Sequence, residues 1–243
     1  MPDVTSTERV VVLMAMEPEG AALRARMSDV TESDEHGIRV SRGALGGRPV
    51  TAVLCGIGKV AAATAATAVV VSERPRVLIS AGVAGGVRRD VGTGSLLVVS
   101  GAVEHDYDLR PFVSDRGHGF AGPRLWRADA EAVSALHAAA SATTHALREP
   151  VAVIDAWTAT GDHVVTNREK HTAIRELGAD IACVDMETAA VAYVAEALGV
   201  PWVGLRVISD EADEHLEVDP VLTRARDGGA LLADVLEHYL AAR

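Results

Sequence analysis

The sequence predicts an α/β fold in which helices cover both faces of a largely parallel sheet. Short, continuous apolar runs, such as VVVLM at Val10–Met14, are typical of strands buried on both faces. These runs alternate with Ala-rich stretches of helical length, as strand–helix–strand units require. The 243 residues contain no linker, low-complexity tract or internal repeat, so we expect one domain over residues 1–243.

The expected elements follow in chain order from the same pattern. The strands are predicted at Val10–Met14, Arg39–Arg42, Pro49–Leu54, Val77–Ser80, Ser95–Val103, Val151–Ile154 and Trp202–Ile208. The helices are predicted from Pro18 to about Met27 and at Lys59–Val71, Ala128–Ala146, Asn167–Leu177, Glu187–Leu198 and about Leu222–Ala242. Pro18 suits a first helical turn, and Gly46-Gly47 suits a turn between two strands. Asp108–Pro123 has no clear periodicity and is predicted to be a functional or interface loop.

Composition and charge exclude several classes of partner. The chain has 23 Lys+Arg against 34 Asp+Glu, a net charge of −11, and no basic run, which argues against nucleic acid or an anionic membrane. The opening MPDVTSTERV lacks a signal pattern, and no apolar run could span a bilayer. Cys55 and Cys183 both lie in apolar stretches and are expected to be buried, reduced thiols. We therefore expect a soluble, cytoplasmic protein.

The glycines in Gly56–Lys59 follow a strand and open a helix, a position that two phosphate-binding motifs share. A P-loop needs Gly five residues before Gly58 and Ser or Thr after the Lys, but Val53 and Val60 stand there. Gly56, Gly58 and Ala61 fit a relaxed dinucleotide fingerprint, yet the next strand lacks the acidic residue that would bind a ribose. Neither motif is therefore supported.

Metal binding has no support in the sequence. No His/Cys spacing suits zinc, and no nucleophile elbow is present. The pair His105-Asp106 could ligate a metal, but a hydrogen-bonded structural histidine is the favoured interpretation. No metal or other cofactor is expected.

Four stretches place functional chemistry at the carboxyl end of a strand, where α/β sheets bind ligands. Glu17 and Glu19 follow the first strand, although acids in a first helical turn are also favoured by the helix dipole. CGIGKVAAA and SAGVAGGV are expected to be glycine-rich loops that either approach a ligand closely or simply turn tightly. The fourth stretch begins at Asp185 and ends beyond Asp210.

This fourth stretch contains Arg206 within a strand that reads as buried on both faces. A buried guanidinium costs several kcal/mol unless an anion meets it. Asp185 suits a helix cap, Glu187 suits a first-turn acid, and Asp210 follows the strand directly. Carboxylates and one Arg at one sheet edge indicate acid–base chemistry, with a structural ion-pair network as the alternative.

Several stretches together resemble one family. AMEPE, GIGKVAAA, AGVAGG, HDYDLRPF, TGDHVV, VDMETAAVAYVA and RVISDEAD occur in the order and spacing of the purine nucleoside phosphorylase/nucleosidase superfamily. The chain is most similar to the 5′-methylthioadenosine/S-adenosylhomocysteine nucleosidase branch, from about Val10 to Asp213. The resemblance implies a nucleoside phosphorylase-like, three-layer α/β/α sandwich with a central mixed, largely parallel and partly barrel-like sheet. It also implies hydrolysis of the N-glycosidic bond of 5′-substituted adenine nucleosides.

The resemblance implies catalytic roles for three charged residues and a binding role for a fourth. Asp210 matches the acid that protonates the purine at N7, and Glu19 matches the base that activates water. Arg206 matches the residue that helps to hold this water and its glutamate. Glu187 matches the carboxylate that binds the ribose hydroxyls.

The resemblance also implies apolar contacts with the substrate. Met186 matches a residue packed beside the sugar, while Met16 and Ile57 match residues lining the ribose and the 5′ substituent. Leu109 and Phe112 match residues that close the 5′ pocket, partly from the neighbouring subunit. A homodimer is therefore implied.

Some positions depart from the family pattern. Val83 stands where nucleosidases commonly carry Ser or Thr, Val164 stands where many carry a Phe stacked on adenine, and Pro18 replaces a common acidic residue. Val165 and Ser209 complete the expected substrate site. A related substrate, such as 5′-deoxyadenosine or a futalosine-type nucleoside, stays open.

Two other functions fit these residues less well. A phosphorylase would bring Arg and Ser or Thr to phosphate, but LISAGVAGG offers only Ser80, and Glu19 favours water. A non-catalytic nucleoside-binding protein has little need for a proton-donating Asp beside a water-activating Glu, and all four charged positions are present.

Overall fold

The computed structural model describes residues 7–149, 151–178 and 180–242. Residues 1–6, which belong to the opening stretch predicted to lack a signal pattern, lie outside the described residues. The strands are β1 Thr7–Met14, β2 Ser28–Glu35, β3 Ile38–Leu45, β4 Arg48–Leu54, β5 Pro75–Gly86, β6 Leu96–Glu104, β7 His118–Gly119, β8 Gly122–Pro123, β9 Leu125–Arg127, β10 Val153–Thr160, β11 Ile181–Asp185 and β12 Trp202–Asp210. The helices are α1 Glu17–Arg26, α2 Lys59–Glu73, α3 Ala130–His145, α4 Glu169–Arg175, α5 Thr188–Leu198 and α6 Val218–Ala241.

One mixed, ten-stranded sheet forms the middle layer, in the order β11-β10-β6-β12-β5-β1-β4-β3-β2, with β9 beside β6. Its central strands β4, β1, β5 and β12 are parallel. β11 also pairs with β5, antiparallel, so β5, β12, β6, β10 and β11 close into a ring. The predicted mixed and partly barrel-like sheet is confirmed.

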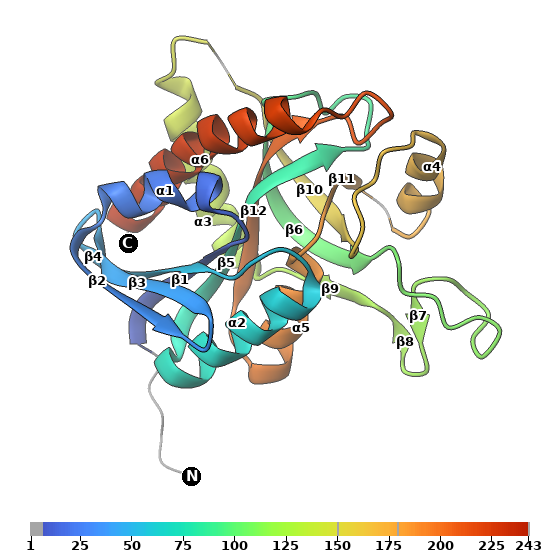
Figure 1. Cartoon of the computed structure of the whole chain (residues 1–243), viewed down its shortest axis with the longest axis horizontal. Helices are drawn as coiled ribbons and strands as arrows, with labels where there is room; N and C mark the ends of the chain where they lie inside the picture. The colour runs from blue at the N-terminus through green and yellow to red at the C-terminus, as the bar shows by residue number, and fades with distance from the viewer. Residues whose placement is uncertain (1–6, 150, 179, 243) are drawn as a thin grey trace.

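Helices cover the two faces of this sheet (Figure 1). Helices α1, α3 and α6 lie on one face, where Leu232 and Leu236 of α6 pack with Val12 and Ile79 of the sheet. The Ala-rich helices α2 and α5 lie on the other face and pack closely through small side chains. Gly229 of α6 lies directly against the backbone of the first turn of α1. The predicted three-layer sandwich is thus confirmed.

Some predicted element boundaries were wrong. SAGVAGGV, expected to be a loop, continues strand β5 as far as Gly86. A Cβ on Gly85 would lie 2.8 Å from the Cβ of Ala212, just beyond β12, and 3.3 Å from Cγ2 of Val184 in β11, so the lack of a side chain at Gly85 lets these segments pack against β5. The strand predicted at Val151–Ile154 begins at Val153 and runs to Thr160. The predicted loop Asp108–Pro123 contains the two short strands β7 and β8.

Cys55 and Cys183 are free and buried, as predicted. Burial raises the pKa of each thiol to about 12, so both stay protonated and unreactive. Among the helices that the structure describes, none combines the length and apolar character needed to cross a membrane.

Candidate active site

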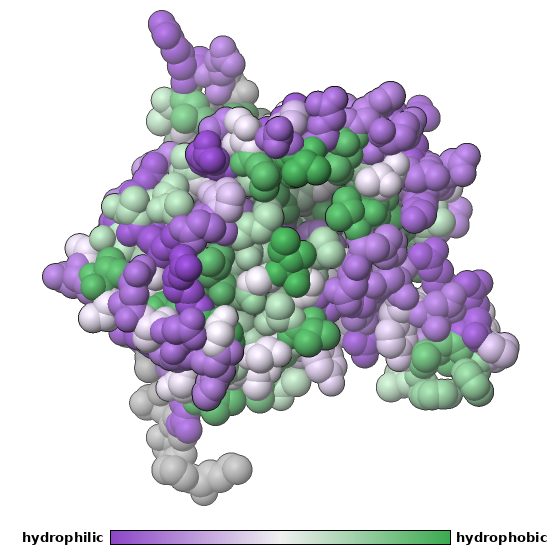
Figure 2. All heavy atoms as spheres, in the orientation of Figure 1, coloured by the Kyte–Doolittle hydropathy of each residue, from purple (hydrophilic) through white to green (hydrophobic). Residues whose placement is uncertain are grey.

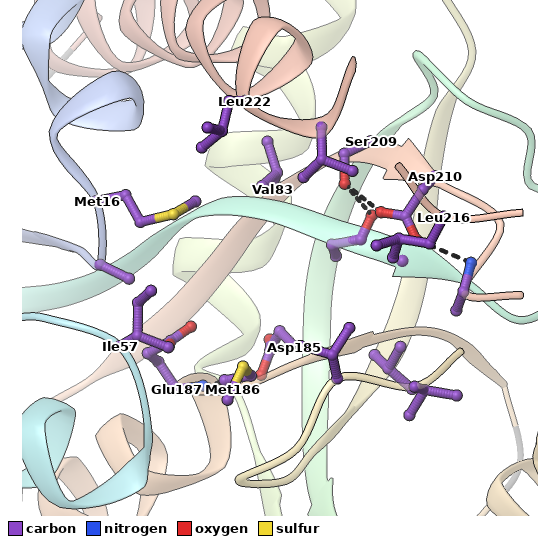
Figure 3. Close-up of a pocket in the computed structure, with 18 of the residues that line it drawn as sticks. Met16, Ile57, Val83, Asp185, Met186, Glu187, Ser209, Asp210, Leu216 and Leu222 are labelled. Carbon is purple, nitrogen blue, oxygen red and sulfur yellow. Dashed lines mark hydrogen bonds between the residues drawn. The ribbon is translucent and has the colours of Figure 1, made fainter. Parts of the chain in front are cut away.

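A pocket of about 270 Å³ opens where several strands end, beneath the N-terminal part of α6. Figure 2 shows apolar side chains around this hollow, and Figure 3 shows the side chains that line it. Many of the expected site residues line it together: Met16, Glu19, Ile57, Val83, Val164, Val165, Met186, Glu187, Ser209 and Asp210. Arg206 lies buried behind the lining, and Leu109 and Phe112 do not line the pocket of their own chain.

Glu19 projects from the first turn of α1 and is almost fully buried. Its Oε2 accepts hydrogen bonds from the backbone N–H groups of Ala15 at 3.1 Å and Met16 at 2.8 Å. Its Oε1 accepts from the N–H of Val83 at 2.9 Å. Burial raises the pKa of Glu19 above its ordinary value, opposed by these N–H groups and by the charge of Arg206. The carboxylate is therefore held in one orientation.

The contact with Val83 bears on one departure from the family pattern. The interaction with Glu19 comes from the backbone of Val83 and does not depend on its side chain. The Val83 side chain instead lies near Gly228 of α6. Replacement of Ser or Thr by Val thus leaves this hydrogen bond to Glu19 intact.

Arg206 of β12 is 1% exposed, and the anion that meets its guanidinium is Asp185. Its Nε donates to Asp185 Oδ2 at 3.2 Å, and its Nη2 donates to Ser80 Oγ at 2.9 Å and Thr188 Oγ1 at 2.6 Å. Burial alone would raise the pKa of Asp185, but Arg206 and the surrounding hydroxyls hold it below its ordinary value. Arg206 affects Glu19 through its charge rather than through a direct ion pair.

Asp185 and Glu187 have different surroundings. Asp185 Oδ1 accepts from the N–H of Thr188, the first residue of α5, and so supports the start of this helix, although Glu187 rather than Asp185 occupies the N-cap position. Glu187 Oε1 faces the pocket and accepts from the N–H of Gly58 at 2.9 Å. Burial, followed by the charge of Asp185, raises the pKa of Glu187 to about 7, although Arg206 opposes this.

Asp210 ends β12, across the pocket from Glu187 in Figure 3. Its Oδ1 accepts from Ser209 Oγ at 2.6 Å, and its Oδ2 accepts from the N–H of Ala212 at 2.9 Å. One pocket thus holds the carboxylates of Glu19, Glu187 and Asp210 between apolar walls, and Asp185, paired with Arg206, also contributes to its lining.

His105 is buried, and the hydrogen bonding expected of a structural histidine is not found at its Nε2 atom, which has no hydrogen-bond partner within the described part of the chain. Burial lowers the pKa of His105 to about 4, and its ring packs edge-on against His163.

Comparison with known proteins identifies the family of this chain. The family model described as the phosphorylase superfamily matches residues 9–241. The chain belongs to this superfamily. The 5′-methylthioadenosine/S-adenosylhomocysteine nucleosidase of Shewanella halifaxensis (strain HAW-EB4) is 31% identical over 230 residues, 94% of this chain and 98% of the relative. This places the chain in the nucleosidase branch, as its motifs predicted.

Solved structures of such nucleosidases have the same fold. The enzyme from Neisseria meningitidis, in complex with methylthio-immucillin-A, has a TM-score of 0.88 and 27% identity, covering 98% of this chain and 100% of the other. The enzyme from Colwellia psychrerythraea 34H, in complex with adenine, has a TM-score of 0.85 and 28% identity, covering 97% of each chain.

In this phosphorylase-superfamily member, the sequence did not predict His163 of the pocket lining or two further kinds of site residue. The first is the set of backbone donors, from Ala15, Met16, Gly58 and Val83, which no side-chain pattern reveals. The second is the apolar wall that follows Asp210, formed by Leu216, Val218, Val221 and Leu222. The apolar residues that follow the Ser-Asp pair could have indicated this wall.

Proposed function

We propose that the chain hydrolyses the N-glycosidic bond of 5′-substituted adenine nucleosides and releases adenine. The observation that carries this proposal is the meeting of Glu19, Glu187 and Asp210 in one pocket of a nucleosidase-branch chain. Methylthioadenosine, S-adenosylhomocysteine and 5′-deoxyadenosine are the substrates that we consider first.

The proposed mechanism matches one group to each developing charge. Bond cleavage builds positive charge on the ribose and negative charge on the departing purine. Asp210 donates a proton to N7, Glu19 removes a proton from the attacking water, and Glu187 binds the ribose hydroxyls. A positioned acid or base of this kind contributes about 10²–10⁴-fold in rate.

Water is favoured over phosphate as the nucleophile. Among the described residues that line the pocket there is no Lys or Arg to bind a phosphate anion. Arg206 is buried and donates to Asp185, Ser80 and Thr188. Glu19 would also repel a phosphate, whereas it can orient a water.

The 5′ substituent is proposed to be apolar near the sugar. Met16, Ile57, Val218 and Leu222 provide aliphatic and thioether contacts. Val164 is 56% exposed and offers an aliphatic contact to the purine. A futalosine-type nucleoside is the second candidate; a carboxylate on its 5′ group, like that of S-adenosylhomocysteine, would have to extend beyond the described lining, which contains no Lys or Arg.

We also propose that the chain forms a homodimer. Phe112 and Phe120 are 77% and 81% exposed, and Val60, at the start of α2, is 80% exposed. Apolar side chains of this size favour burial against a partner. The expected role of Leu109 and Phe112 in the neighbouring pocket supports a second copy as that partner. Sedimentation should give a dimer that Phe112→Glu weakens and Val71→Glu, at the far end of α2, leaves intact.

We place the activity in the cytoplasm. Free thiols such as Cys55 and Cys183 persist in reducing compartments. Fractionation of expressing cells should recover the activity with cytosolic proteins, and recovery with secreted proteins would contradict this placement.

The decisive experiment measures release of the free base, adenine from methylthioadenosine, S-adenosylhomocysteine, 5′-deoxyadenosine and adenosine or hypoxanthine from inosine, with and without phosphate. We expect release from the 5′-substituted adenine nucleosides at undiminished rate in phosphate-free buffer. Strict dependence on phosphate would overturn the hydrolase proposal. Binding without release across the whole panel would instead indicate a nucleoside-binding protein.

A further inference from the structure

We propose that Lys59, Asp106 and Asp162 form a clamp that holds the Gly56–Gly58 turn and thereby positions Glu187 for the ribose of the substrate. All three side chains lie outside the pocket lining, so they are positioning residues rather than catalytic ones. This inference rests on the proposed function, because it concerns the sugar-binding part of the same pocket.

The turn between β4 and α2 needs support from elsewhere in the chain. Gly56 and Gly58 both adopt positive φ, at 86° and 97°, and Gly58 occupies the N-cap of α2 without a capping side chain. Yet the N–H of Gly58 makes the hydrogen bond to Glu187 Oε1. Figure 3 shows Ile57, in the middle of this turn, beside Glu187. The position of the turn therefore determines how Glu187 is held.

The clamp supplies this support from two distant loops. Asp162 Oδ1 accepts from the backbone N–H of Lys59 at 2.8 Å, and so caps α2 from a residue 103 positions away. Lys59 Nζ donates to Asp106 Oδ1 at 2.6 Å, and Asp106 Oδ2 accepts from the N–H of Asp162 at 2.8 Å. Each member thus bonds to the other two, in a closed triangle.

The clamp also connects two sides of the pocket. Asp162 follows β10 and precedes His163, Val164 and Val165, all of which line the pocket. Lys59 follows the turn that contacts Glu187. Because Asp162 joins these segments, the wall carrying Val164 and the turn beside Glu187 are held at a fixed separation.

The pKa of Glu187, which depends on the groups around it, provides a specific test of the clamp. Asp185 of β11, Arg206 of β12, Glu19 of α1 and the Cys55 thiol after β4 face it, and Gly58 gives it an N–H donor. Burial raises the pKa of Glu187 to about 7, and the N–H of Gly58 opposes this increase. Loss of the donor should therefore move the pKa of Glu187 further upward and shift the pH dependence of KM to higher pH.

The test compares Asp162→Ala with Asp162→Asn, using methylthioadenosine as substrate over a pH range that extends well to either side of the Glu187 pKa of about 7. Asn keeps an Oδ1 acceptor for the Lys59 N–H, whereas Ala removes it. We expect Asp162→Ala to raise KM about tenfold, the usual cost of a lost hydrogen bond to a charged group, with a smaller effect on kcat. In Asp162→Ala, the rise in KM on the acid side of the pH profile should begin at a higher pH than in wild type. Asp162→Asn should behave like wild type.

Asp129→Ala is the matched control. Asp129 caps α3 through the N–H of Ala132 at 2.8 Å and does not line the pocket. It should lower Tm while leaving KM and its pH dependence unchanged. Unchanged KM and pH profile in Asp162→Ala, or an equal change in Asp129→Ala, would overturn the clamp.

Failure of the proposed function can be distinguished from failure of the clamp. If wild-type protein releases no adenine, the proposed function fails, but amide hydrogen exchange of residues 56–60 still tests the clamp. Faster exchange in Asp162→Ala than in Asp162→Asn supports it. Equal exchange in the two variants contradicts it.

Discussion

The Glu19 carboxylate lies directly over the Cα of Gly82, where a Cβ would stand 2.6 Å from Glu19 Oε1. The same Cβ would lie 3.3 Å from Arg206 Nη1. Strand β5 therefore needs Gly at this position to leave room for the proposed base and for the guanidinium behind it. No positive φ is involved, so the requirement is for space.

Gly82→Ala should reduce kcat/KM by about 10² or more, the contribution of a positioned general base, because Glu19 must leave its Val83 hydrogen bond. Gly92→Ala is the control, since a Cβ on Gly92 meets nothing within 4 Å. Steady-state kinetics with thermal melts checks both variants. Wild-type activity in Gly82→Ala would show that Glu19 does not depend on this space.

Asp210→Asn should abolish turnover while the protein still folds. An amide cannot donate the proton that the departing purine needs, but it can preserve both local contacts, since its oxygen can accept from the N–H of Ala212 and its NH2 group can donate to Ser209 Oγ. Adenine release, with circular dichroism to verify folding, measures the effect. Full activity in this variant would remove Asp210 from the mechanism.

Glu19→Gln should stop chemistry but retain substrate binding, because the amide keeps the size of the carboxylate but cannot remove a proton from water. Turnover assays and calorimetric titration with methylthioadenosine separate the two effects. Glu17→Gln is the control, as Glu17 lies in the same helical turn but pairs with Arg24 and Arg39 at the surface. Equal losses in both variants would argue against Glu19 as the base.

Activity should fall as pH decreases through about 7, because Glu187 then becomes protonated and accepts the ribose hydroxyls less well. The same raised pKa has the opposite effect on stability, because it makes the folded state less stable as pH rises. Between pH 4.5 and about 7 the folded state retains a proton that the unfolded state has released, so this group lowers the free energy of unfolding as pH rises. Denaturant titrations should show less of this decline in Glu187→Gln. An identical decline would assign it to other groups.

Val164→Phe should lower KM for adenine nucleosides several-fold, since an aromatic contact contributes about 0.5–1.5 kcal/mol beyond its area. Val164 is exposed at the pocket and has room for a larger side chain. Comparison of KM for methylthioadenosine before and after the change is the measurement. Unchanged KM would place the purine elsewhere.

The fold was predictable where burial leaves a pattern in the sequence. Strands such as β1 and β12, covered on both faces, need continuous apolar runs, and these were recognised. β2 has the sequence SDVTESDE and lies largely exposed at the sheet edge, so its strand conformation comes from pairing with β3 and not from its own side chains. β11 is only five residues long and merges with the start of α5, and it too was missed.

The site was predictable where residue type carries the chemistry. Glu19, Glu187 and Asp210 were expected at strand ends, and the structure brings them to one pocket. The sequence also indicated that Arg206 needs an anion, but charge alone does not say which one, and the direct partner is Asp185. Backbone donors such as Val83 N–H leave no trace in residue type, because every residue except proline has one.

The packing of α6 on α1 also determines when the site can form during synthesis. Gly229 approaches so closely that a Cβ there would lie 2.6 Å from the carbonyl oxygen of Glu19. The helix also brings Val218, Val221 and Leu222 to the pocket wall. A nascent chain that has emerged as far as Asp210 already carries every charged residue of the site, but it lacks the helix that encloses them. Activity should therefore begin only after α6 has left the ribosome and docked, so that no partly made chain consumes substrate.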